Sequence, residues 1–240
     1  MEIKKNVLSY TEDDLINWLL SRPILADIMK LLYPPSFWDH VQLDIHQGVR
    51  GHEIPAVGNR EIDLVVFPKG KPENATTVQV KQTKITLRLN RKEKLDRYCK
   101  EKIKKGVQQS VSDIAIGFQR SYFLLVVEYD GSENYHGFFA PAPSQFDQIG
   151  KLVSTIASKE NPSGTAGLSY LVVSQISSKK TIDAAGALMK PPTSLREPLT
   201  REQPSSLTRD LSKLPVVDKH YCNISSCPYT YLKLDYQQTV

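Results

Sequence analysis

The sequence predicts a mixed α/β domain in which helices flank a small central sheet. Three short segments, 40–46, 61–67 and 77–82, show the period-two alternation of half-buried strands, and a longer segment at 91–115 has a helical period. A continuous apolar run at 121–127 is typical of a central strand. With 40% hydrophobic and 24% charged residues, the chain of 240 residues has an ordinary globular composition and can bury a sizeable core.

The first expected element is a helix that begins at Thr11. Thr11 is suited to the N-cap, and the acids at 12–14 favour the first turn because they complement the helix dipole. Apolar side chains then recur at helical spacing as far as Leu32, and Pro23 is expected to kink or restart the helix.

The segments 61–67 and 77–82 are expected to pair as an antiparallel hairpin, because only turn-forming residues separate them. Strand alternation places Asp63 on one face of the first strand and puts Gln79 and Lys81 together on one face of the second. If these faces coincide, a carboxylate, an amide oxygen and an ammonium group converge. These three side chains together would suit the binding of a hard cation and a phosphate.

The helix expected at 91–115 has a buried face formed by Leu95, Cys99, Ile103, Val107, Val111 and Ile114. A further helix is expected at 144–158 and a further strand at 168–176.

From residue 179 the chain changes character and becomes rich in Pro, Ser and Thr. We therefore divide it into an α/β domain at 1–178 and a C-terminal segment at 179–240 that should be extended, wrapping or partly disordered.

Charge and cysteine content narrow the function classes. The net charge is +5, and positive charge is concentrated at 81–105, where eleven basic residues face three acidic ones. This segment suits contact with a phosphate backbone, and we select Lys84, Arg88 and Arg91 as the first DNA-binding candidates. Such contacts do not by themselves distinguish DNA from RNA.

The three cysteines are scattered and the N-terminus is polar, which predicts a cytoplasmic protein. Since the sequence has no long apolar run, we do not expect it to enter a membrane. The common loops and elbows of nucleotide-binding proteins and serine hydrolases are also missing from the sequence.

The predicted order α-β-β-β-α-β, with an acid on the second strand and polar-x-Lys on the third, resembles the PD-(D/E)XK nuclease superfamily. The matching residues are Asp63 and Gln79-Val80-Lys81, with Glu12 as a match to the helical acid that some members use. The Gln-x-Lys version is similar to that of Mrr-like restriction endonucleases. The resemblance covers about half of the chain.

This resemblance implies a Mg²⁺-dependent DNA endonuclease of a restriction or defence type, with Mn²⁺ as a substitute. Asp63 would be the essential metal ligand, helped by the Val80 carbonyl, the Gln79 side-chain oxygen and Glu12. Lys81 would orient or deprotonate the attacking water and stabilise charge in the transition state. Cutting both strands would favour a homodimer.

Two other interpretations remain open. Most superfamily members carry an acid where this chain has Gln79, so the protein could be an inactive nuclease-like module that binds DNA or a protein partner. Alternatively, Asp63 and Lys81 could form a structural ion pair in an unrelated α/β protein.

Overall fold

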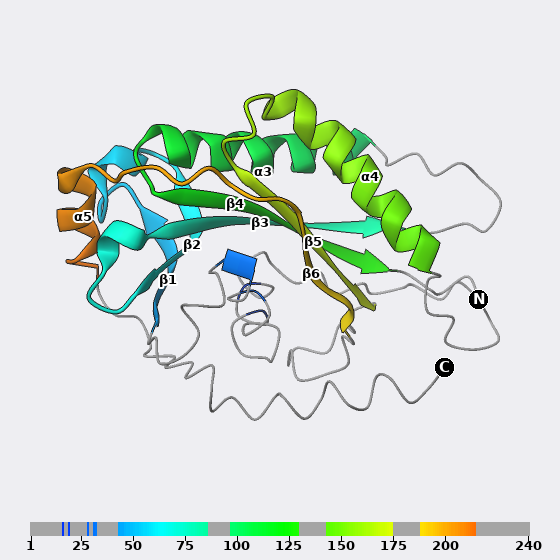
Figure 1. Cartoon of the computed structure of the whole chain (residues 1–240), viewed down its shortest axis with the longest axis horizontal. Coiled ribbons are helices and arrows are strands. Elements are labelled where there is room, and N and C mark those ends of the chain that lie inside the picture. The colour runs from blue at the N-terminus through cyan, green and yellow to red at the C-terminus, as the bar shows by residue number, and fades with distance from the viewer. Residues whose placement is uncertain are drawn as a thin grey trace, which may run out of the picture.

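A six-stranded mixed sheet forms the centre of the protein (Figure 1). The computed structural model describes residues 43–85, 97–129, 143–174 and 188–214, together with five helical positions near the N-terminus: Ile16, Leu19, Ile28, Leu31 and Leu32.

The strands lie in the sheet in the same order as in the chain. They are β1 (Leu43–Arg50), β2 (Glu61–Pro68), β3 (Thr76–Ile85), β4 (Arg120–Tyr129), β5 (Gly167–Ser174) and β6 (Leu188–Arg196). Strand β2 is antiparallel to both of its neighbours, β1 and β3; β3, β4 and β5 are parallel, and β6 is antiparallel to β5. The two parallel connections are made by helices, as crossovers between parallel strands require.

Helices α3 (Arg97–Ala115) and α4 (Pro143–Glu160) are these connections, and both cover the same face of the sheet (Figure 1). The opposite face packs against the N-terminal helical positions, since Ile16, Leu19, Ile28 and Leu32 share a buried cluster with strand residues. A third apolar cluster lies at the β1–β2 end of the sheet, where α5 (Ser205–Leu211) packs against buried residues of these two strands. No described helix has the length and apolarity needed to cross a lipid bilayer.

The predicted α/β class is confirmed, and β1 to β4 with α3 follow the predicted order β-β-β-α-β. Of the expected first helix the structure describes five helical positions, and Thr11 and Pro23 lie outside the described residues. Residues 61–67 and 77–82 do form neighbouring antiparallel strands. The expected end of the first strand was wrong: we placed it at residue 46, but β1 continues to Arg50. Gly48 allows this continuation because it adopts a positive φ of 66° inside the strand.

The C-terminal segment is more regular than its composition indicated. Strand β6 pairs with β5 and completes the sheet, although Pro191 and Pro192 lie within it. Proline cannot donate to a ladder, but β6 is an edge strand, and its register shifts around this position.

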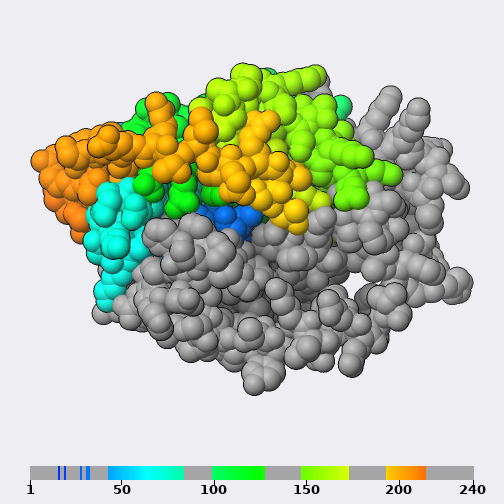
Figure 2. All heavy atoms as spheres, viewed as in Figure 1, coloured from blue at the N-terminus to red at the C-terminus, as the bar shows by residue number. Residues whose placement is uncertain are grey.

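Between β6 and α5 the chain has no regular secondary structure and is held by backbone hydrogen bonds. Leu199 donates a backbone hydrogen bond to Thr165 (3.0 Å) and Arg201 donates one to Gln119 (2.9 Å). Figure 2 shows the gold and orange atoms of this segment running along the surface to α5. The described part of 179–240 therefore belongs to the same sheet and core as the residues before it.

The packing of α5 gives a stability prediction. Leu211 is buried and Leu199 is 53% exposed, so Leu211→Ala should lower the free energy of unfolding by about 2 to 4 kcal/mol, whereas Leu199→Ala should change it by less than about 0.5 kcal/mol. Urea denaturation measures both. Equal losses in the two variants would contradict the docking of α5 on the core.

Candidate functional site

The candidate site lies where β2 and β3 separate. Their ladder is confined to the pairs Leu64–Val78, Val65–Thr77 and Val66–Thr76. Beyond it, β2 remains paired with β1 and β3 remains paired with β4. We call this opening the fork, and define it by residues 61–63 of β2 and 79–81 of β3.

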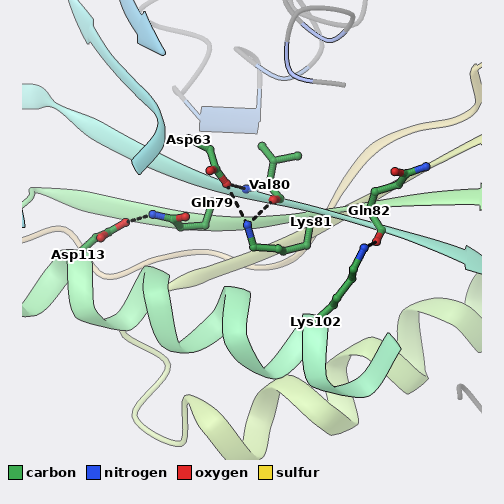
Figure 3. A network of polar contacts seen from close by, with 7 residues as sticks. All are labelled: Asp63, Gln79, Val80, Lys81, Gln82, Lys102 and Asp113. Carbon is green, nitrogen blue, oxygen red and sulfur yellow. Dashed lines mark hydrogen bonds and ion pairs between the residues drawn. The ribbon is translucent and has the colours of Figure 1, made fainter. Parts of the chain in front are cut away.

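Side chains replace the missing ladder bonds inside the fork. The backbone amide of Val80 donates to Asp63 Oδ2 (2.6 Å), and Lys81 Nζ donates to the Val80 carbonyl oxygen (2.9 Å). Lys81 Nζ also lies 3.4 Å from Asp63 Oδ2 (Figure 3). A carboxylate thus takes the place of a backbone acceptor, and an ammonium group takes the place of a backbone donor.

Both charged residues are nearly enclosed, with Asp63 8% and Lys81 7% exposed. The register of β1 places Gly48 opposite Asp63, between the printed pairs of Gln47 with Leu64 and Val49 with Ile62, so no cross-strand side chain stands there. Burial strengthens the attraction between the two charges, but each would be costly without the other.

Helix α3 holds Lys81 in place through Gly106. A Cβ atom at Gly106 would lie 2.3 Å from the Phe123 ring and 3.0 Å from Lys81 Cγ. Glycine inside a helix costs about 1 kcal/mol relative to alanine, but here it lets α3 approach the sheet closely. The stem of Lys81 is therefore confined between α3 and β3.

Gln79 lies beside the pair and is fully buried. Its Nε2 donates to Asp113 Oδ2 on α3 (3.0 Å), while its Oε1 has no hydrogen-bond partner among the described residues. Figure 3 shows the nitrogen directed toward Asp113 and the oxygen on the side of Asp63 and Lys81.

Asp113 and Arg60 were missed by the sequence analysis. The Asp113 side chain is completely buried, and its Oδ1 accepts from Arg60 Nη1 at 3.0 Å. A signal for Asp113 did exist: it follows buried Val107 and Ser110 at helical spacing, so it occupies an apolar phase of α3. Arg60 carried no comparable signal, because it precedes β2 in a connection.

Burial raises the pKa of Asp113 from 3.8 to about 6, and hydrogen bonds from Gln79, Arg60 and Thr77 and the charge of Arg60 oppose the rise. The carboxyl group is therefore ionised at neutral pH. An ionised carboxylate this far from water depends on its donors, which links α3 to β3 and to the start of β2.

The other predicted residues are distributed as follows. Glu61, which shares a face with Asp63 in strand alternation, pairs with Arg50 at 2.6 Å near the surface. Lys84 belongs to β3, where its backbone is paired with Glu128. Glu12, Arg88 and Arg91 lie outside the described residues.

Metal binding at the fork would rely on a sparse set of donors. Within the ranges that the structure describes, no group of three His, Cys, Asp or Glu side chains is arranged so that it could hold a metal ion. The fork does offer the Asp63 carboxylate, the Val80 carbonyl and the unpartnered Gln79 oxygen, which are the hard oxygen donors that Mg²⁺ prefers. The residues fit a Mg²⁺ site in which water completes the coordination.

Comparison of the chain with protein-family models and with curated proteins finds no match.

The raised pKa of Asp113 predicts how stability depends on pH. The folded state holds this proton more tightly than the unfolded state does, so ionised Asp113 destabilises the native protein above pH 6, and the effect is relieved as pH falls toward 4. Relative to Asp113→Asn, the wild-type free energy of unfolding should rise by about 2 kcal/mol between pH 7.5 and pH 4.5. Urea denaturation of both proteins at the two pH values measures the change, and a constant or falling difference would contradict it.

Proposed function

We propose that the protein is a divalent-metal-dependent endonuclease that hydrolyses phosphodiester bonds of DNA, in a restriction-like or defence role inside the cell. The observation that carries this proposal is the convergence in the fork of the Asp63 carboxylate, the Val80 carbonyl and the Lys81 ammonium group. It is supported by the unpartnered Gln79 oxygen beside them.

Asp63, the Val80 carbonyl and Gln79 would hold the cation, with Glu12 as a further candidate outside the described residues. A bound Mg²⁺ or Mn²⁺ would neutralise charge on the phosphate and make a bound water more acidic. Lys81 already contacts two of the oxygens in question, so cation binding would release its ammonium group from them.

The released ammonium group would then have a defined task. Lys81 has its stem packed against α3 at Gly106, so its reach is restricted to the fork. There it can orient the attacking water or donate to a phosphate oxygen as charge develops. Asp63 keeps the Val80 amide satisfied while it holds the cation, since a carboxylate has lone pairs for both.

A second candidate, a nuclease-like module without activity, is favoured by the charge of the fork. Glu61 is paired with Arg50 near the surface, the Asp63 carboxylate is balanced by Lys81, and Gln79 is neutral. Such a balanced pair stabilises the strand separation without any cation. Basic residues near the fork could then bind DNA without cleaving it, or another surface of the protein could bind a protein partner.

The two candidates differ in what Asp63 and Lys81 do for cleavage. If the protein is a nuclease, Asp63→Asn and Lys81→Met should each lower Mg²⁺- or Mn²⁺-dependent nicking of plasmid DNA by about 100-fold or more. Glu61→Gln and Lys71→Met are matched controls and should retain activity, because Glu61 is paired with Arg50 and Lys71 is exposed in the loop before β3.

Stability separates loss of chemistry from loss of fold. Each single variant leaves one buried charge unpaired, at a cost of about 3 to 5 kcal/mol, and the double variant Asp63→Asn/Lys81→Met should recover part of that loss. A double variant that regains stability but not nicking supports the nuclease. DNA binding without nicking in the wild type supports the module, and the absence of both supports a structural ion pair.

The basic segment predicts a salt effect on DNA binding. Replacing Lys84, Arg88 and Arg91 together by Gln should flatten the slope of log affinity against log salt concentration by about 2 to 3, because each phosphate contact contributes about 0.9. Fluorescence anisotropy with a labelled duplex measures the slope. The control replaces the exposed Lys69, Lys71 and Lys213 by Gln, and an equal change in both triple variants would argue against a specific binding segment.

A further inference from the structure

The orientation of the Gln79 amide is set by a residue outside the fork. Gln79 is fully buried, and its Nε2 is bonded to Asp113 while its Oε1 has no partner among the described residues. A buried acceptor without a donor is costly, and native proteins seldom keep one without a use for it. The open oxygen is thus the end of the side chain at which a ligand is expected.

Asp113 is fixed from two sides. Oδ2 accepts from Gln79 and Oδ1 accepts from Arg60, each at 3.0 Å. The guanidinium group of Arg60 also reaches the backbone carbonyl of Gln109 on α3 (3.5 Å). Arg60 thereby ties the start of β2 to the turn of α3 that carries Asp113, and its positive charge favours the ionised carboxylate.

Both oxygens of the Asp113 carboxyl group act as hydrogen-bond acceptors, Oδ1 from Arg60 and Oδ2 from Gln79. Gln79 must therefore present its NH₂ group to Asp113, and its oxygen is turned toward Asp63 and Lys81 (Figure 3). A flipped amide would set its oxygen against the carboxylate oxygen. The contact to Asp113 is what distinguishes the two ends of the amide.

We propose that Asp113 is a positioning residue, which aims the Gln79 side-chain oxygen at the fork as a ligand for the divalent cation. This inference rests on the proposed nuclease function and deepens it. It also accounts for a neutral residue at position 79: the carboxylate lies at position 113, one hydrogen bond away, and a second carboxylate at 79 would face it directly. Gln79 and Asp113 together carry one negative charge and are joined by one hydrogen bond.

The inference is tested by exchanging the two groups. Asp113→Asn can donate as well as accept, so Gln79 loses its fixed orientation; Gln79→Glu places two carboxylates face to face; and the double variant Gln79→Glu/Asp113→Asn restores one donor, one acceptor and one charge. Each change keeps the size of the side chain. Asp147→Asn, at an exposed position on α4, is the matched control.

Binding of Mn²⁺ without DNA is measured by titration calorimetry at pH 8, and stability by thermal unfolding. Asp113→Asn should weaken Mn²⁺ binding by about tenfold or more, as loss of a group that orients a ligand typically does. Gln79→Glu should lower the melting temperature by roughly 5 to 10 °C. The double variant should regain the melting temperature and bind Mn²⁺ within about threefold of the wild type, and the control should match the wild type.

Two results would overturn the inference while leaving the nuclease in place: Mn²⁺ affinity unchanged in Asp113→Asn, or a double variant no better than Gln79→Glu alone. A wild type that neither binds Mn²⁺ nor nicks DNA would overturn the proposed function, and the role of Gln79 as a ligand with it. The melting temperatures then still decide the orientation. Recovery in the double variant supports the contact of Asp113 with the Gln79 amide, and no recovery refutes it.

Discussion

The separation of β2 from β3 is the constraint around which the candidate site is built. A strand that loses its neighbour exposes amide and carbonyl groups, and these need partners when they are buried. In this protein the peptide of Val80 finds them in the Asp63 carboxylate and the Lys81 ammonium group. The structural requirement of the sheet and the chemical character of the site are therefore met by the same two side chains.

Helix α3 determines how rigid this arrangement is. Gly106 lets the helix lie close enough to confine the stem of Lys81, and Asp113, farther along the same helix, holds the Gln79 amide. Because Arg60 binds Asp113 from the start of β2, both arms of the fork are attached to one helix. Any shift of α3 would therefore change the lysine, the glutamine and the spacing of the strands together.

Local patterns in the sequence were enough to predict the central part of the fold. The alternation in residues 61–67 and 77–82 predicted both strands and their antiparallel pairing. It left open whether Asp63 and Lys81 lie on the same side, and the structure brings these two side chains together. The contact between Gln79 and Asp113 was beyond such reasoning, because 34 residues and a change of element separate the two. Asp113 could have been noticed as an acid in an apolar phase, but its partner could not have been named.

Composition misled us in the C-terminal segment. Pro191 and Pro192 made residues 188–196 look unsuitable for a strand, yet an edge position tolerates them. Likewise, α5 is only seven residues long, and Leu207 and Leu211 at i, i+4 spacing were its one periodic signal. A short helix of this kind forms only where the rest of the fold offers an apolar surface on which it can pack. The local sequence pattern does not contain that information.

Because the described strands lie in the sheet in chain order, each strand from β2 to β6 finds a neighbour already synthesised when it leaves the ribosome. None of the described strands has to wait for a later one to be inserted between it and its predecessor. During synthesis the growing margin of the sheet is open to pairing with other nascent chains. Among the described strands the last is β6, whose consecutive prolines at 191 and 192 cannot support a continuous further ladder, so β6 protects its own edge of the sheet from aggregation.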